Sequence, residues 1–224
     1  SNFAATSSGR IMTSDDVFFY LLSSLQPVEL TSELLEQAYC SSYFPMADEN
    51  GCIAWHSPDP RAVIPLETWR VPKSLRKVIA SGLYHVTVDT AFEEVVRACS
   101  RRDKVRPEEV WISEEILTAY TDLHREGNAH SVETWIGDRL VGGLYGVSFG
   151  AAFFGESMFS HESNASKVAF AALVERLRHH GYTLLDSQYA NAYTMQFGAV
   201  EVSRERYLAM LAAALERKCG FHEE

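Results

Sequence analysis

Asp186 and Gln188 are the residues of this chain whose types and spacing best suit catalysis. They close a segment, residues 182–188, whose residue types predict a strand. Residues two apart in a strand point to the same side, so we expect the acid and the amide to lie together. Because an α-amino group has a pKa near ~8, such a pair beside a cavity could orient and deprotonate an incoming amine. The alternative is that Asp186 only satisfies backbone donors of a turn.

The stretch from Leu140 to Phe170 predicts the cavity. No charged residue occurs from Leu140 to Gly155, and glycines recur among the apolar residues, which argues against a membrane helix. Glycines at this density mark bends or close approaches, and indicate buried strands that line a cavity. Polar residues follow at the edge where strand turns to helix, and we expect them at the mouth of the pocket: Glu156, Ser157, Ser160, Asn164 and Ser166.

Other chemistries have little support. The eight histidines form no HExxH motif and pair with no cysteine at ligand spacing, so we expect no metal. Ser157 lacks the glycine two residues later that a nucleophile elbow needs, which disfavours a serine hydrolase. No Walker or Rossmann glycine signature occurs, and Arg139 to Leu144 only approximates a coenzyme A pyrophosphate loop. We therefore expect no cofactor.

Two basic runs, residues 61–77 and 97–106, stand out in a chain whose formal net charge is −10. The acidic balance speaks against nonspecific coating of nucleic acid, so any such contact must use a local patch. The basic runs are candidate phosphate contacts. The alternative is that they are solvated faces with cations near helix ends.

The composition limits the classes of protein to which this chain can belong. The chain has 224 residues, of which 46% are hydrophobic and 12% aromatic, as in a globular protein. The four cysteines are scattered without a CxxC pair, which is typical of reduced thiols in the cytosol. The small, polar start has no basic-then-apolar segment. We expect a cytoplasmic protein without a membrane association.

Periodicity predicts the elements that position these residues. Residues 16–30 look irregular, and a short helix follows from Thr31 or Ser32, before a proline-punctuated loop. The next elements are a strand at 83–89, a helix from Thr90 to Cys99, and a helix from Ser113 to Gly127. A three-strand meander follows over 130–155, then a helix from Asn164 or Ser166 to Gly181, the 182–188 strand, and a helix from Ser203 to Lys218.

This order predicts an α+β fold of mixed α/β character. We expect a small N-terminal domain with proline-rich loops over residues 1–75. Residues 76–224 would form a domain like the GCN5-related acyltransferases, with a mixed, mainly antiparallel sheet flanked by helices. The fold alone does not give the reaction.

Nine short motifs, in this order and spacing, carry a specific resemblance. They are YFPM, WHSPDPR, SLRK, AHSVE, LVGGLYG, FFGESMFS, NASK, LLDSQ and FGAVEVSR, and they extend over roughly residues 20–210. The chain resembles the leucyl/phenylalanyl-tRNA–protein transferases, and GESMFS followed by NASK is its most specific feature.

The resemblance implies an enzyme that moves leucine or phenylalanine, and less well methionine, from aminoacyl-tRNA to the N-terminus of an acceptor protein. Acceptors would begin with Arg or Lys and would be marked for degradation. The aminoacyl ester is already activated, so neither a metal nor coenzyme A is implied. We expect a monomer whose partners are aminoacyl-tRNA and acceptor proteins or peptides.

The resemblance also assigns residues. Asp186 and Gln188 match the pair that assists proton removal from the amine. An apolar pocket for the amino-acid side chain, with Glu156 and Ser160 at its rim, would be formed by Leu144, Phe153, Met158, Phe170, Leu173, Leu177 and Leu185. An ordinary core is the alternative for some of these apolar residues. Contacts to tRNA would come from Met46, Arg61, Arg76, Lys77, Trp111 and Tyr120.

Two alternatives stay open. The first is a related aminoacyl-tRNA-dependent ligase that acts on a cell-wall precursor or a small amine. The second is a noncatalytic module that binds tRNA or peptide. The chain also departs from the family pattern at Met46 and His56, near the expected adenosine, and at Tyr193 and Gln196. These departures leave acceptor preference and adenosine contacts open.

Overall fold

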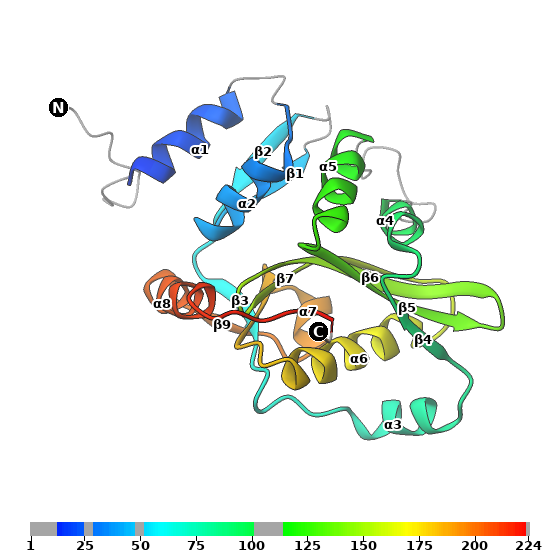
Figure 1. Ribbon diagram of the computed structural model, residues 1–224. Coiled ribbons are helices and arrows are strands. Elements are labelled where there is room, and N and C mark those ends of the chain that lie inside the picture. The colour runs from blue at the N-terminus through cyan, green and yellow to red at the C-terminus, as the bar shows by residue number, and fades with distance from the viewer. Residues whose placement is uncertain (1–12, 25–28, 48–51, 101–113, 223–224) are drawn as a thin grey trace.

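The computed structural model describes residues 13–24, 29–47, 52–100 and 114–222, and a seven-stranded sheet forms its centre (Figure 1). The strand order is β4-β5-β6-β7-β8-β3-β9. The β7–β8 pair is parallel and the other five pairs are antiparallel. The bounds are β3 (Arg61–Ile64), β4 (His85–Val88), β5 (Ala129–Ile136), β6 (Arg139–Phe149), β7 (Ala152–Ser160), β8 (Leu184–Gln188) and β9 (Val200–Val202).

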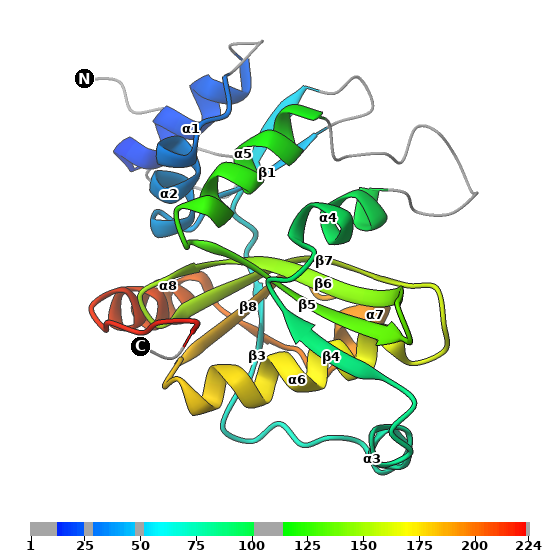
Figure 2. The same ribbon diagram turned by 45° about the vertical axis from the view of Figure 1, so that its right-hand side comes forward.

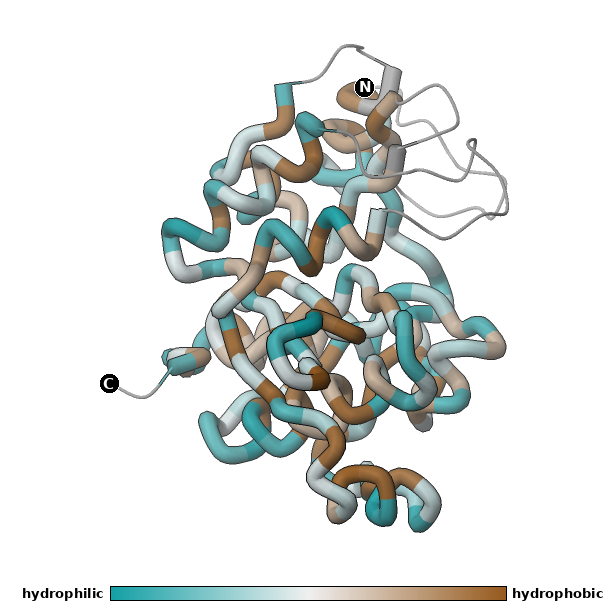
Figure 3. The backbone as a smooth tube through the Cα atoms, turned by 90° about the vertical axis from the view of Figure 1, so that its right-hand side faces the viewer, coloured by the Kyte–Doolittle hydropathy of each residue, from teal (hydrophilic) through white to brown (hydrophobic). Residues whose placement is uncertain are grey.

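Helices cover both faces of the sheet (Figures 1 and 2). One face packs against α4 (Phe92–Ser100) and α5 (Glu114–Arg125), and the other against α6 (Ala165–His179). Hydrophobic and hydrophilic residues alternate along the helical coils, which therefore have an apolar side for the core (Figure 3). The remaining helices of this part are α3 (Lys73–Ala80), α7 (Ala192–Gln196) and α8 (Arg204–Leu215).

The N-terminal part contains α1 (Ser14–Ser24), α2 (Ser32–Cys40) and a two-stranded sheet of β1 (Phe44–Ala47) and β2 (Ile53–His56). Thr31 caps α2, since its side-chain oxygen accepts from the backbone N–H of Leu34 at 3.2 Å. Buried residues of this part, Tyr39 among them, join the same hydrophobic cluster as Tyr145 and Phe154 of the large sheet. The two parts thus share a core.

The predicted fold class is confirmed, with a mixed, mainly antiparallel sheet between helices. The meander and the helices on either side of it lie close to where the sequence predicts them, but its third strand, β7, continues to Ser160 rather than ending at residue 155. The predicted proline-punctuated loop contains the strands β1, β2 and β3. The prediction that residues 16–30 are irregular is wrong, because Ser14–Ser24 form α1. The boundary at residue 75 stays a prediction, although β3 lies before it and belongs to the large sheet. None of the described helices is long and apolar enough to cross a membrane.

Candidate active site

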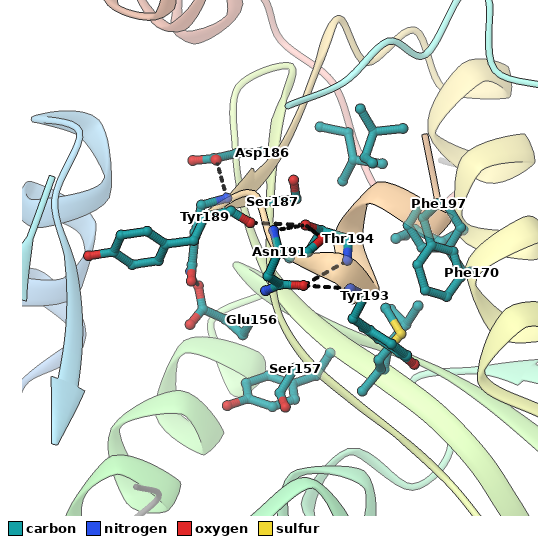
Figure 4. Close-up of a pocket in the computed structure, with 18 of the residues that line it drawn as sticks. Glu156, Ser157, Phe170, Asp186, Ser187, Tyr189, Asn191, Tyr193, Thr194 and Phe197 are labelled. Atoms are coloured by element: carbon teal, nitrogen blue, oxygen red, sulfur yellow. Dashed lines mark hydrogen bonds between the residues drawn. The ribbon is translucent and has the colours of Figure 1, made fainter. Parts of the chain in front are cut away.

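A cavity of about 340 Å³ opens where β7 and β8 separate (Figure 4). These parallel strands pair at only three positions, and the last pair joins Phe154 to Asp186. Beyond it β7 continues to Ser160 beside β6, while β8 ends at Gln188. The splayed strand ends leave a space, and its volume is in the range of small-molecule sites.

Glu156 projects at this opening because the sheet is irregular there. Tyr145 pairs with Ser157 and Gly146 pairs with Gly155, so Glu156 is the extra residue of a β-bulge. A bulge interrupts the alternation of a strand and redirects the side chain next to it. Glu156 thereby lines the cavity itself, rather than only its rim as the sequence predicts.

Two neighbours hold the Glu156 carboxyl group. The side-chain amide of Gln188 donates to Oε1 at 2.8 Å, and the hydroxyl of Tyr120 donates to Oε2 at 3.3 Å. Burial, together with the nearby charge of Asp186, raises the pKa of Glu156 to about 8, and hydrogen bonds from Tyr39 and Tyr120 only partly offset this effect. The group therefore changes its protonation near the pH at which an α-amino group also titrates.

Tyr120 is itself held by Tyr39. Both side chains are fully buried and their hydroxyl groups are hydrogen bonded to each other. Burial raises the pKa of both phenols well above the ordinary value, so both remain protonated donors. Tyr39 belongs to α2, and this chain of hydrogen bonds therefore links the N-terminal part to Glu156.

Asp186 is fully buried and lies beside the cavity. Its carboxylate accepts from the guanidinium of Arg61 at 2.6 to 3.1 Å and from the hydroxyl of Tyr207 at 2.7 Å. It also accepts from the backbone N–H of Gln188 at 2.8 Å. With its oxygens engaged in this way, Asp186 fixes the end of β8 and so positions Gln188.

The expected side-by-side arrangement of Asp186 and Gln188 is altered by a second irregularity. Ala62 pairs with Gln188 and Val63 with Asp186, so Ser187 is an extra residue in β8. Gln188 has a left-handed backbone with φ 65°. The two side chains consequently contact different groups, since Asp186 binds Arg61 and Gln188 binds Glu156.

Arg61 is not a surface cation, which corrects its assignment to tRNA binding. Only 1% of it is exposed, and its guanidinium lies between the rings of Phe44 and Tyr207, 4.7 and 4.6 Å from their centroids. It also donates to the backbone oxygen of Ser42 at 3.1 Å. A buried carboxylate needs such a partner, and the sequence alone did not show that Asp186 is buried.

The apolar wall of the cavity comes from the sheet and from α6. Phe170 and Phe197 are neighbours in it, with ring centroids 4.4 Å apart (Figure 4). The predicted residues that line the cavity are Leu144, Met158, Phe170, Leu173 and Leu185, and the structure adds Ile64 and Phe197. Met46 of β1 also lines it.

The predicted pocket residues that lie outside the lining are Phe153, Ser160, Asn164, Ser166 and Leu177. Phe153 precedes the separation of the strands, and its ring packs on Gly146 and stacks on Phe221 at 5.5 Å. Leu177 lies one turn beyond Leu173 on α6, about 6 Å further along the axis, and is buried in the core. Ser160 is exposed and hydrogen bonds near the start of α6.

The other predicted tRNA contacts are dispersed. Arg76 and Lys77 are exposed on α3, at the opposite end of the molecule from α1 (Figures 1 and 2). Tyr120 is buried against Glu156, which differs from the expected contact with an adenosine. Trp111 lies outside the described residues, as do the basic residues of 101–106.

The segment that follows β8 forms part of the site, which the sequence did not lead us to expect. Tyr189, Asn191, Tyr193 and Thr194 line the cavity. The Asn191 side chain accepts from the backbone N–H groups of Tyr193 and Thr194, both at 2.9 Å, and forms a capping box that starts α7. A polar residue three positions before a threonine, directly after a strand, was the available signal.

The fold and the site together define a class of α+β protein with an apolar cavity and a carboxyl–amide pair at the opening between two strands. Residues 28–59 match the family model for the leucyl/phenylalanyl-tRNA protein transferase N-terminal domain, and residues 63–212 match the model for leucyl/phenylalanyl-tRNA protein transferase. The chain belongs to the leucyl/phenylalanyl-tRNA–protein transferase family.

Curated relatives support this assignment over most of the chain. A leucyl/phenylalanyl-tRNA–protein transferase from Gloeobacter violaceus is 51% identical over 195 residues, covering 87% of this chain and 98% of that protein. A transferase of the same name from Paramagnetospirillum magneticum is 50% identical, covering 86% of this chain and 92% of that protein. The matched span includes both the N-terminal part and the large sheet.

Proposed function

We propose that this chain transfers leucine or phenylalanine from aminoacyl-tRNA to the N-terminal α-amino group of an acceptor protein. The observation that carries the proposal is the position of the Glu156–Gln188 pair at a cavity whose wall is apolar. Family membership supplies the substrate class, and the cavity supplies a place for its amino-acid side chain.

The reaction needs an uncharged amine and a proton acceptor. The amine nitrogen attacks the ester carbonyl carbon, the new C–N bond forms, and the bond to the terminal ribose oxygen breaks. The proton released by nitrogen ends on that ribose oxygen. The ester is already activated, so the protein contributes position and proton transfer.

Within this proposal Glu156 exchanges the proton. Its pKa of about 8 lies near that of an α-amino group, so transfer between the two is nearly balanced. Gln188 orients Glu156 and can also hydrogen bond to the ester. Asp186 acts through Gln188, because Arg61 and Tyr207 already occupy its carboxylate. In this way Asp186 would assist proton removal from the amine, as the resemblance implies, by positioning Gln188.

The wall of the cavity explains the selectivity that we propose. Leucine and phenylalanine are unbranched at Cβ and can extend toward Phe170 and Leu173, and methionine can do so less well. Isoleucine and valine carry an extra methyl group close to the backbone. One methyl group is worth only ~1–3 kcal/mol, so we expect graded rather than absolute discrimination.

We also propose the partners at the mouth of the cavity. The acceptor would begin with Arg or Lys and would be marked for degradation, and the net charge of −10 favours the approach of such cationic N-termini. Arg76 and Lys77 are exposed cations that can contact tRNA phosphates.

A transfer assay tests this function. Leucyl-, phenylalanyl-, methionyl- and isoleucyl-tRNA with labelled amino acids are each incubated with peptides that begin with Arg, Lys or Asp. We expect label in the Arg and Lys peptides, with leucine and phenylalanine ahead of methionine and isoleucine last. Bound tRNA without transfer to any peptide would favour a binding module, and transfer only to small amines would favour a different ligase.

A further inference from the structure

Three residues far apart in the sequence meet at the edge of the sheet beside the C-terminal segment. Asp89 follows β4, His130 lies on β5, and His222 lies near the end of the chain. Nδ1 of His130 is 2.7 Å from Oδ2 of Asp89, and Nε2 of His222 is 2.6 Å from the same oxygen. The three ligand atoms all lie within 4.8 Å of one another.

The surrounding structure holds Asp89 and His130 in place. The backbone N–H of Ser131 donates to Oδ1 of Asp89 at 2.7 Å, which leaves Oδ2 to face the two imidazoles. Asp89 has a left-handed backbone, φ 53°, that non-glycine residues rarely adopt. The side chain of His130 is only 4% exposed, so its ring cannot move far.

Phe221 holds the adjacent His222 in position. The ring of Phe221 stacks on His130, with centroids 4.0 Å apart, and on Phe153 at 5.5 Å. The backbone oxygen of Phe221 accepts from Nε of Arg176 at 2.8 Å. His222 therefore reaches Asp89 from a fixed position, while its own side chain is 55% exposed and can adjust.

We propose that Asp89, His130 and His222 bind a divalent cation of the zinc class. Two imidazole nitrogens and one carboxylate oxygen are ligands that zinc prefers, and a fourth, solvent position completes four-coordination. Tetrahedral zinc bonds of ~2.0–2.2 Å place ligand atoms roughly 3.3–3.6 Å apart, so the ligand atoms must separate by about 0.6–0.9 Å from their hydrogen-bond distances of 2.6 and 2.7 Å. The exposed His222 side chain permits this shift. The proton on each ligating nitrogen moves to the other nitrogen of its ring, so that both imidazoles bind the ion in their neutral form.

His124 is an outer neighbour of this site. Its Nδ1 is 3.9 Å from Oδ1 of Asp89 and donates to the backbone oxygen of Ala129 at 2.8 Å. That nitrogen is thus engaged, and we assign His124 no bond to the ion. A bound ion would link the C-terminal segment to β5 and to the end of β4, and would thereby stabilise the folded chain.

Calorimetric titration of tag-free, chelator-treated full chain with ZnCl2 tests the proposal. We expect one ion per chain, and at least about tenfold weaker binding in Asp89→Asn and His222→Gln. The double variant His179→Gln, His180→Gln is the control, because it removes the adjacent histidines at the end of α6 and should bind as the wild type does. MgCl2, a cation that prefers oxygen ligands, should not compete.

Thermal unfolding supplies a second readout. At a hundredfold excess of ZnCl2 over its dissociation constant, the melting temperature of the wild type should rise by about 5 °C or more, and that of His222→Gln should not. His222 is exposed, so this variant should fold. Undetectable zinc binding, unchanged affinity in His222→Gln, or equal competition by MgCl2 would each overturn the proposal.

Discussion

Gln188 and Glu156 are joined by a hydrogen bond of 2.8 Å across the gap between two strands that have separated. Each residue owes its position to an irregularity: Glu156 is a bulged residue of β7, and Gln188 follows the extra residue Ser187 with a left-handed backbone. The pair is thus a product of the distorted sheet, and it marks the opening of the cavity.

Glu156→Gln should lower the rate of amino-acid transfer by roughly 10²–10⁴-fold, because the amide keeps the size of the side chain but cannot take a proton. The affinity for aminoacyl-tRNA should change little. Single-turnover transfer and equilibrium binding measure the two effects separately. Equal losses in rate and affinity would show that Glu156 only supports the fold of the site.

The pH dependence of stability should also report on Glu156. Its folded pKa of about 8 is above the ordinary carboxyl value of 4.5, so between these values the native state holds a proton that the unfolded state has lost. The favourable contribution of the protonated carboxyl is complete below the unfolded pKa and is lost as pH rises toward 8. Relative to the wild type, Glu156→Gln should therefore gain on the order of a few kcal/mol between pH 4.5 and pH 8.

Urea unfolding at several pH values measures this difference. A constant offset between the wild type and Glu156→Gln across the range would mean that the carboxyl group has no raised pKa in the folded protein. A wild type that becomes more stable toward pH 8, relative to the variant, would reverse the predicted sign.

Arg61→Met should destabilise the protein by about 3–5 kcal/mol, because it leaves the buried Asp186 carboxylate without its cation. Arg76→Met is the matched control on the exposed α3, and its free energy of unfolding should stay within about 0.5 kcal/mol of the wild type. Similar values for the two variants would contradict a buried Arg61–Asp186 pair.

The predicted selectivity can be tested with two leucines of one helix. Leu173→Ala and Leu177→Ala both remove a buried side chain of α6, and each should cost about 2–5 kcal/mol of stability. Leu173 lines the cavity and Leu177 does not. Only Leu173→Ala should shift the ratio of phenylalanine to leucine transfer, in favour of phenylalanine, by about tenfold. An equal shift in Leu177→Ala would show that the cavity does not set the selectivity for the amino acid.

The double variant Arg76→Glu, Lys77→Glu should weaken tRNA binding and reduce the slope of log affinity against log salt by about 1–2 units. Arg125→Glu, at the end of α5, reverses another exposed cation and should leave both unchanged. If the salt dependence of the double variant matched that of the wild type, α3 would not contact the tRNA.

Much of this fold could be predicted from the sequence because its elements depend on local patterns. The turn at Gly137 and Asp138, the meander around it and the apolar periodicity of α6 are local features. The residues of the cavity wall were assigned through the family resemblance, and the periodicity shows only that Phe170 and Leu173 share a face of α6. The capping box at Asn191 was also local, but its short helix was overlooked.

The rest depends on contacts between distant residues. Arg61 and Asp186 are 125 positions apart, and nothing near Arg61 indicates that it is buried. The bulges at Glu156 and Ser187 are set by the register with neighbouring strands, which a single strand does not encode. The resemblance placed Phe153 in the cavity wall, although the strands separate only after it.

A crystal structure of the chain with leucyl-adenosine, in which an amide replaces the ester, would show directly whether the cavity binds the transferred amino acid. The leucyl side chain should lie against Phe170, Leu173 and Leu185, and its carbonyl group should lie beside Gln188 and Glu156. A leucyl group bound elsewhere, with this cavity unfilled, would contradict the role that we propose for the cavity.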